Sequence, residues 1–280
     1  MSVLDKLKLQ VVEQIDNAVF VVKNQNDLQF YWIDHPVARA LIARQGAHLI
    51  SYHPAGHDEQ LFVSPLESYQ AQKAIRGGVP ICWPWFGKAA SPSHGYARIH
   101  DWDLEQVLSD QHQVQLTFSF ADQQLVGDLQ LSYSLTIGKQ LALALTTTNS
   151  GAHEQSYSGA LHSYFAANRE SLSLEGLGER YIDSTNGSEC TEQQFALVDE
   201  TDRVYLAPTP TTLLDGKTIA HQGNDSVVVW NPGYQLAGNM ADLGEASAAH
   251  FICVETAITQ QPIVLGAGES HTLTQTVTPG

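Results

Sequence analysis

The sequence has few positive charges for its length, and this shortage narrows the classes of partner. Its 280 residues include 14 Lys and Arg against 30 Asp and Glu, for a formal net charge of −16. Neutralising nucleic-acid phosphates requires clustered Lys and Arg, so we expect neither a nucleic-acid partner nor a polybasic membrane surface. A small anion can still bind where a few arginines are placed against the overall field, which makes each Arg in a candidate site informative.

Cysteines and long apolar runs are also scarce. Cys82, Cys190 and Cys253 are odd in number and far apart, which predicts neither a disulfide framework nor a metal pair. We expect three small buried side chains in a reducing compartment. No apolar run approaches the roughly 18 residues that span a bilayer. The first residues lack an apolar segment after a basic one, so we predict a cytoplasmic protein without a signal peptide.

Helical signals are few, and alternation with period two dominates. Residues 3–15 fit a short helix or a strand, and residues 237–250 fit one or two helical turns. Gly138 and Lys139 suit a hairpin turn between two alternating runs. The alternating or β-rich runs are 28–34, 113–120, 128–138, 140–150, 226–231 and 250–255. They predict an all-β fold, a large sandwich or barrel with few short helices, as a single domain over residues 1–280.

Two segments interrupt this alternation. AIRGGVPICWPWFG (74–87) places Arg76 among glycines, prolines and aromatic side chains. Aromatic faces beside a fixed Arg suit a sugar with an anionic substituent, but a packed strand corner with an incidental Arg explains the composition equally well. SPSHGYARIHDW (91–102) contributes His94, Arg98 and His100, which alone would fit a solvated loop. No His or Cys spacing in the chain predicts a zinc or iron site.

Three ionisable side chains lie in or beside expected strands. His162 lies in YSGALHSYFAAN (157–168), where a lone His is more often a core residue than a catalyst. Glu255 is expected to end the strand in HFICVETAI (250–258). It would either emerge into solvent there or be buried with a raised pKa that suits proton transfer. Asp202 precedes a strand-like VYL and can accept hydrogen bonds from sugar hydroxyls or cap a turn.

Taken in order, these segments resemble the glucose-6-phosphate 1-epimerase branch of the aldose 1-epimerase (galactose mutarotase-like) family. The matching pieces are IRGGVPICWPWFG, HGYAR, LHSYF, TDRVY, VVWNP and CVE, which run from residue 75 to residue 255. The resemblance implies a β-sandwich of the supersandwich type. It also implies an isomerase that interconverts the α and β anomers of a hexose 6-phosphate, with glucose 6-phosphate as the expected substrate.

The same resemblance implies roles for individual residues. His162 and Glu255 would occupy the catalytic positions, and Arg76, His94 and Asp202 would bind substrate. Opening a pyranose removes a proton from the C1 hydroxyl and delivers one to the ring oxygen. We expect Glu255 to act as the base at O1 and His162 as the acid at the ring oxygen, which requires a protonated imidazole beside an ionised carboxylate.

Other features of the site follow less directly. Arg76, Arg98 or both would hold the phosphate by charge-assisted hydrogen bonds. Any of three aromatic residues could stack on the sugar, namely Trp83, Trp85 and Phe86. The chain departs from the family pattern at Thr256, where Pro often follows the glutamate, and at Gly233, where a bulkier residue is common. Both departures are expected to change the wall of the site.

Three alternatives stay open at this point. A non-catalytic carbohydrate-binding protein could use the same sandwich, although a binding site needs no acid/base pair. A mutarotase for unphosphorylated galactose or glucose is a second alternative, although the extra arginines and the RGGVPICWPWFG block favour a phosphorylated substrate. A glycosidase would need two carboxylates across the bond, for which only Glu255 and Asp202 are candidates. We expect no metal, nucleotide or redox cofactor, a small sugar phosphate as the partner, and a monomer.

Overall fold

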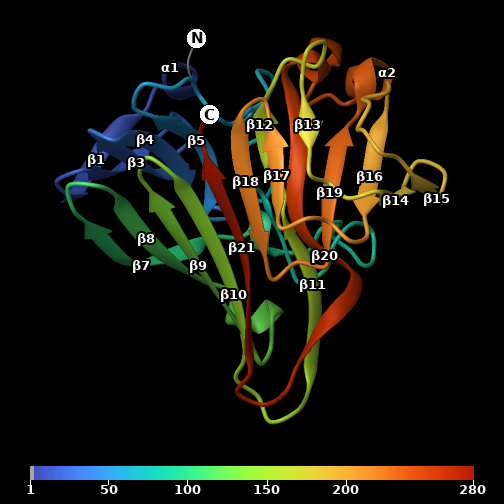
Figure 1. Cartoon of the computed structure of the whole chain (residues 1–280). Helices are drawn as coiled ribbons and strands as arrows, with labels where there is room; N and C mark the ends of the chain where they lie inside the picture. The colour runs from blue at the N-terminus through green and yellow to red at the C-terminus, as the bar shows by residue number, and fades with distance from the viewer. Residues whose placement is uncertain (1–2) are drawn as a thin grey trace.

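The computed structural model describes residues 3–280 and consists mainly of antiparallel strands in three sheets (Figure 1). A short helix, α1 (Val3–Leu7), precedes the first sheet. That sheet has five strands in chain order, β1 (Gln10–Asp16), β2 (Val19–Lys23), β3 (Gln29–His35), β4 (Ala38–Ala43) and β5 (His48–Pro54). Residues 3–15 therefore contain both structures that the sequence allowed, a helical turn and then a strand.

The second sheet has eight strands in the order β13-β17-β18-β21-β10-β9-β8-β7. Their bounds are β7 (Trp102–Ser109), β8 (Val114–Phe120), β9 (Leu129–Ile137), β10 (Leu141–Asn149), β13 (Leu174–Glu175), β17 (Thr211–Leu214), β18 (Lys217–Gln222) and β21 (Ser270–Thr278). The hairpin predicted at Gly138 and Lys139 is confirmed, because β9 ends and β10 begins on either side of this turn.

The third sheet also has eight strands, in the order β15-β14-β16-β19-β20-β11-β6, with β12 paired to β20 off this path. Their bounds are β6 (Ile81–Cys82), β11 (Gln155–Leu161), β12 (Tyr164–Ala166), β14 (Arg180–Asp183), β15 (Ser188–Thr191), β16 (Thr201–Tyr205), β19 (Ser226–Asn231) and β20 (Phe251–Leu265). β20 lies near the middle of this sheet and is its longest strand.

Helices in the described chain are short. They are α2 (Gly233–Asn239) and three 3-10 turns, η1 (Ala97–Ile99), η2 (Gln123–Leu125) and η3 (Glu245–His250). The expectation of helical turns within residues 237–250 is confirmed, although α2 begins earlier. No helix in residues 3–280 combines the length and the apolar character needed to cross a bilayer. The predicted all-β sandwich with few short helices is confirmed.

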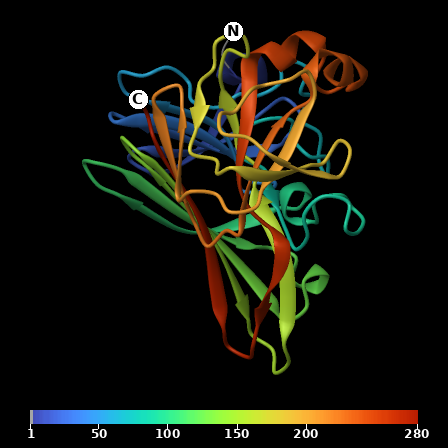
Figure 2. The same cartoon turned by 45° about the vertical axis from the view of Figure 1, so that its right-hand side comes forward.

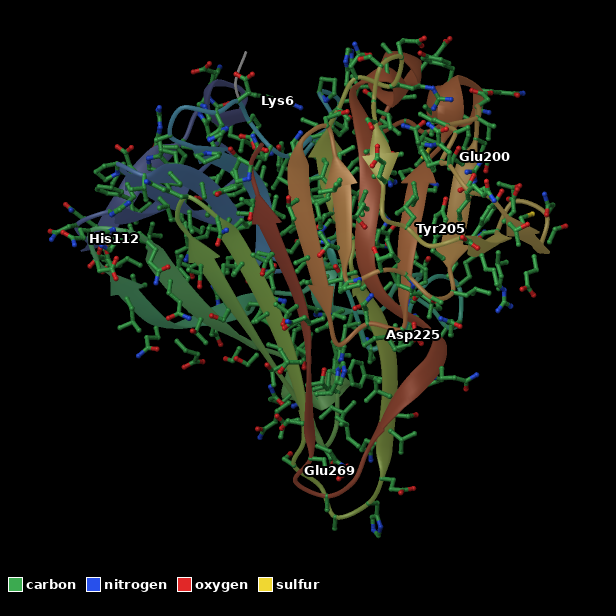
Figure 3. The ribbon with its side chains drawn as sticks, viewed as in Figure 1. Lys6, His112, Glu200, Tyr205, Asp225 and Glu269 are labelled. Atoms are coloured by element: carbon green, nitrogen blue, oxygen red, sulfur yellow. The ribbon has the colours of Figure 1, made fainter. Side chains whose placement is uncertain are left out.

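The two eight-stranded sheets pack face to face around the main core. Along β9 and β10 every second side chain is buried, as the period-two pattern predicts. In the third sheet, Ile252, Val254 and Ile258 of β20 point into the same core. At the far tip of the molecule, where Figure 3 labels Glu269, the backbone N–H of Asn149 donates to the Glu269 carbonyl at 2.9 Å. This contact joins the β10–β11 and β20–β21 turns.

The expectation of three buried cysteines holds only in part. Cys82 and Cys253 are fully buried, but Cys190 is partly exposed, and all three are free thiols. Cys190 lies on β15, an edge strand that is exposed along most of its length. An edge strand with one partner has no sheet neighbour to cover its outer side, which explains the difference.

A loop over residues 83–96 folds back on β6 beside β11 and depends on a glycine. In Figure 2 this teal segment projects beside the long green and red strands. Gly95 has φ +76°, and a Cβ added there would lie 2.0 Å from the carbonyl oxygen of Trp83. The same carbonyl accepts hydrogen bonds from the backbone N–H groups of Tyr96 and Ala97. The neighbouring backbone therefore excludes any side chain at residue 95.

We predict that Gly95→Ala destabilises the protein by about 2–4 kcal/mol, the sum of a left-handed backbone and a clash with fixed atoms. Gly187→Ala is a matched control, because Gly187 also has φ +76° but has no atom within 4 Å of an added Cβ. It should cost only about 1–2 kcal/mol. Urea denaturation of both variants tests this, and equal losses would contradict the steric argument.

Candidate active site

His162 and Glu255 form a cross-strand pair in the third sheet. Leu161 pairs with Thr256 and Tyr164 pairs with Cys253, so the register is the same on both sides of the gap between β11 and β12. This register places His162 directly opposite Glu255, and opposed side chains share one face of a sheet. The imidazole Nε2 lies 3.3 Å from the carboxylate Oε1.

Two expectations about these residues were wrong in detail. Glu255 does not end its strand, because β20 continues to Leu265, and the side chain is 1% exposed. His162 does not lie within a strand but in the two-residue interruption between β11 and β12, where its backbone N–H donates to the Pro80 carbonyl at 3.0 Å. The flanking β6 segment and β20 hold the interruption in register, so the alternation of side chains continues through it.

The pair lies on the face of the third sheet that points away from the main core. The next row on this face, across β16, β19, β20 and β12, contains Asp202, Trp230, Cys253 and Tyr164, each opposite its neighbour. On the other side of Glu255 the same face carries the small side chains of Cys82, Ala160 and Ala257, and Val228 lies directly opposite Glu255. His162 and Glu255 therefore lie between a polar, aromatic row and an apolar patch.

Burial shifts the pKa values of both members of the pair toward their neutral forms. Desolvation raises the pKa of Glu255 well above its usual value, and the nearby Asp202 carboxylate raises it further while Arg98 opposes the shift. Desolvation lowers the pKa of His162 well below its usual value, with the nearby His94, Arg98 and Arg76 acting in the same direction. The mechanism expected from the sequence requires an imidazolium at His162 and a carboxylate at Glu255. In the protein without substrate, burial disfavours both of these charged forms.

His94 approaches the pair from the loop at residues 83–96. Its ring lies edge-on to the His162 ring, with centroids 5.8 Å apart. Its Nδ1 accepts a hydrogen bond from the backbone N–H of Gly87 at 3.3 Å. Burial and the two nearby arginines, Arg98 and Arg76, lower the pKa of His94 to about 3. The neutral ring therefore carries its proton on Nε2 and can donate a hydrogen bond to a ligand oxygen.

Arg76 reaches the pair as expected, but its guanidinium already has protein partners. Nε and Nη2 each lie 3.0 Å from the Asp242 carboxylate, and Nη1 donates to the Tyr164 hydroxyl at 3.1 Å. Its backbone N–H donates to the buried Glu67 carboxylate at 2.7 Å. The sequence analysis missed Asp242 and Tyr164, since nothing local links them to Arg76.

Arg98 differs from Arg76 in its partners. Its Nη2 donates to the Ser93 carbonyl at 2.9 Å, while its Nε is buried without a hydrogen-bond partner. Within residues 3–280 no carboxylate lies within ion-pair distance of Arg98. Its charge nevertheless acts on His94, His162 and Glu255. Of the two arginines near the pair, Arg98 is the one without a carboxylate partner among the described residues.

The structure separates the three aromatic candidates. Trp83 is fully buried and donates from Nε1 to Thr147 at 3.1 Å, so it belongs to the core and cannot stack on a sugar. Phe86 is partly exposed, packs on the small-residue patch and lies 4.9 Å from the His94 ring, centroid to centroid. Trp85 donates a hydrogen bond from its indole to the Pro92 carbonyl of its own loop.

Trp230 is a fourth aromatic residue near the pair, which the sequence analysis did not single out. It is partly exposed, and its ring lies 6.1 Å from the His162 ring, centroid to centroid.

A buried polar network lies behind the pair, on the core side of β20. The Gln275 amide accepts from the Ser163 hydroxyl at 2.5 Å and donates to the Val254 carbonyl at 3.2 Å and to Thr256 Oγ1 at 2.9 Å. Thr256 Oγ1 also contacts His221 Nδ1 at 2.7 Å. One side chain of β21 thus fixes residues adjacent to both His162 and Glu255.

The two departures from the family pattern do not shape the wall of the site as expected. Thr256 points into the core network, because alternation along β20 puts it on the face opposite Glu255. Gly233 lies at the start of α2 with φ +66°, and a Cβ there would be 2.4 Å from the Asp199 carbonyl oxygen. Its small size reflects that close backbone approach.

Comparison with known proteins shows the family of the chain. The aldose 1-epimerase family model matches residues 29–278, and the chain belongs to this family of isomerases. A Salmonella typhimurium relative, named "Putative glucose-6-phosphate 1-epimerase", is 35% identical over 288 residues and 96% of each chain. An Escherichia coli relative of the same name is 36% identical over 267 residues and 89% of each chain. The solved structure of a "putative mutarotase" from Salmonella typhimurium has a TM-score of 0.91 at 33% identity, covering 98% of this chain and 97% of that chain.

The buried network makes stability depend on pH in a defined direction. Burial lowers the pKa of His221 to about 4 in the folded protein, against about 6.5 when unfolded. The unfolded state therefore binds a proton first as the pH falls, so this contribution is complete above pH 6.5 and lost between about pH 6.5 and 4. We predict that the free energy of unfolding falls between pH 7 and pH 4.5 in both proteins, and that the fall is about 2–3 kcal/mol smaller in His221→Gln than in the parent. Urea denaturation at the two pH values measures the difference.

His57→Gln serves as the control, because His57 is exposed. A parent and a His221→Gln variant with the same loss on acidification would show that the ring is not held neutral by the fold.

Proposed function

We propose that this aldose 1-epimerase interconverts the α and β anomers of a hexose 6-phosphate, with glucose 6-phosphate as the substrate and His162 and Glu255 as the proton-transfer pair. The observation that carries the proposal is the 3.3 Å contact between Nε2 and Oε1 of two nearly fully buried side chains. Both outer atoms of the pair, His162 Nδ1 and Glu255 Oε2, are buried without a hydrogen-bond partner. A buried pair with unsatisfied atoms is costly for stability and is expected where function requires it.

In the proposed mechanism Glu255 removes the proton from O1 while His162 protonates the ring oxygen. The ring opens, the C1 aldehyde rotates, and closure on the other face returns both protons. The pair holds one transferable proton whether it is neutral histidine beside carboxylic acid or imidazolium beside carboxylate. Substrate hydroxyls that donate to Glu255 stabilise the carboxylate, and a phosphate dianion stabilises the imidazolium. Substrate binding thus supplies the charged form that burial alone opposes.

The remaining residues of the site bind the sugar. His94 donates from Nε2 to a ring hydroxyl, and Asp202 accepts from another. Phe86 and Trp230 supply apolar faces on opposite sides of the pair. Arg98 holds the phosphate, because its Nε has no partner and no carboxylate neutralises its charge, while Arg76 is paired with Asp242 and positions Tyr164.

Removing either proton-transfer group should remove catalysis. We predict that His162→Ala and Glu255→Gln each slow the exchange of glucose 6-phosphate anomers by at least about 100-fold, within the range of general acid–base catalysis. Two-dimensional exchange NMR, corrected for the spontaneous reaction, measures the rate. His153→Ala and Glu154→Gln are matched controls, since both residues are exposed at the far turn. Exchange at the spontaneous rate in the unmodified protein, with glucose, galactose and other hexose phosphates alike, would instead favour a carbohydrate-binding protein.

The phosphate assignment has a separate test. We predict that Arg98→Gln lowers the ratio of kcat/KM for glucose 6-phosphate to that for glucose by about 10- to 100-fold, the value of one charged hydrogen bond. Arg39→Gln, at an exposed position on β4, is the control. Equal losses for both sugars would show that Arg98 acts on the catalytic pair. No loss for either sugar would assign the phosphate to another residue, or the enzyme to unphosphorylated aldoses.

A further inference from the structure

We propose that His162, Cys253 and Glu255 form a binding site for a thiophilic divalent cation such as Zn²⁺, and that an ion bound there blocks the proton-transfer pair. Cys253 has no part in the mechanism above. It lies two residues before Glu255 on β20, so both side chains share one face of the sheet, and it pairs with Tyr164. One ligand atom from each of the three residues lies within 4.8 Å of the other two.

The geometry suits a tetrahedral ion with three protein ligands. Zn²⁺ binds sulfur at about 2.3 Å and nitrogen or oxygen at about 2.0–2.2 Å, so ligand atoms around it stand about 3.3–3.8 Å apart. The 3.3 Å separation of His162 Nε2 and Glu255 Oε1 already meets this. The thiol sulfur of Cys253 lies within 4.8 Å of a ring nitrogen of His162 and of a carboxylate oxygen of Glu255. The fourth position would face the substrate side of the pair.

The chemical character of the trio favours zinc over magnesium or calcium. One sulfur, one imidazole nitrogen and one carboxylate oxygen form a typical zinc set, whereas Mg²⁺ and Ca²⁺ prefer oxygen ligands alone. The ligands come from positions 162, 253 and 255, which no sequence spacing for zinc would combine. That is why the sequence predicted no metal site.

The charges around the trio both oppose and support a cation. Arg98 opposes it, since no carboxylate within residues 3–280 pairs with its guanidinium. Arg76 opposes it less, because Asp242 lies 3.0 Å from its guanidinium. Asp202 supports it from the adjoining row, opposite Trp230, which in turn lies opposite Cys253. A thiolate and a carboxylate as ligands leave a bound Zn²⁺ neutral, so the ion need not carry an unbalanced charge into this buried place.

Such an ion would inhibit rather than assist the proposed reaction. It would occupy the Nε2 and Oε1 lone pairs through which the proton moves. This consequence rests on the proposed function, whereas metal binding itself does not. The two can therefore be measured separately on the same protein.

The binding test uses Co²⁺ as a spectroscopic substitute for Zn²⁺. We expect the unmodified protein to bind one Co²⁺ per chain with a thiolate-to-cobalt charge-transfer band, and Zn²⁺ to displace it. Cys253→Ala should lose the band and bind at least tenfold more weakly, and Glu255→Gln should also weaken binding. Cys82→Ala is the matched control, since Cys82 is equally buried on the same face but lies outside the trio. It should retain the band.

The activity test follows anomer exchange at free Zn²⁺ concentrations fixed with a metal buffer. Zn²⁺ should slow exchange in the unmodified protein and in Cys82→Ala, and a chelator should restore the rate. Cys253→Ala should retain exchange without metal and require at least tenfold more Zn²⁺ for inhibition. A charge-transfer band that survives in Cys253→Ala, or no band with stoichiometric Co²⁺ in the unmodified protein, overturns the site. If the protein shows no exchange at all, the proposed function fails while the cobalt result still decides the metal site.

Discussion

One constraint governs the arrangement of the third sheet, which must hold a buried carboxylate on β20 opposite a buried imidazole. Burying an ionisable group away from water is expensive, and two such groups side by side are tolerated only where the surrounding backbone fixes them. β20 meets this need because it lies in the interior of its sheet, with β19 on one side and β11 and β12 on the other. The face that carries this pair can then be polar because the opposite face of the same strand carries Ile252, Val254 and Ile258 into the core.

The fixed register has a second support, the polar network around Gln275. A purely apolar residue there would fill the space but would leave the Ser163 hydroxyl and the Val254 carbonyl unsatisfied. With Gln275 present, the two backbone segments that carry His162 and Glu255 are joined through a third strand from the other sheet. Side-chain hydrogen bonds are directional, so this network specifies one arrangement of the segments where hydrophobic packing alone would tolerate small shifts.

The sequence predicted the strands well because their signal is local. Alternation in β9 and β10 reports a face that is buried by many neighbours, and neither its period nor its turn depends on a distant partner. His162 was harder to interpret, because a two-residue interruption in a strand leaves little trace in an alternating pattern. Glu255 was placed at a strand end for a similar reason. Charged residues are rare in the middle of central strands, so local reasoning places a glutamate at the point where the strand meets water.

The sequence could not predict that Arg76 and Arg98 have different partners. Both lie in motif-like loops, and composition treats them alike. What separates them is the position of Asp242, which reaches Arg76 from the segment between α2 and η3. A guanidinium with a carboxylate partner is a positioned structural group, and one without such a partner holds its charge available for an anion. The chain has a net charge of −16, and its acidic side chains outnumber its basic ones by about two to one. An arginine without a carboxylate partner is therefore unexpected in this chain. The arrangement therefore provides a local positive charge in an otherwise negative field, which supports the proposed preference for a sugar phosphate over a neutral sugar.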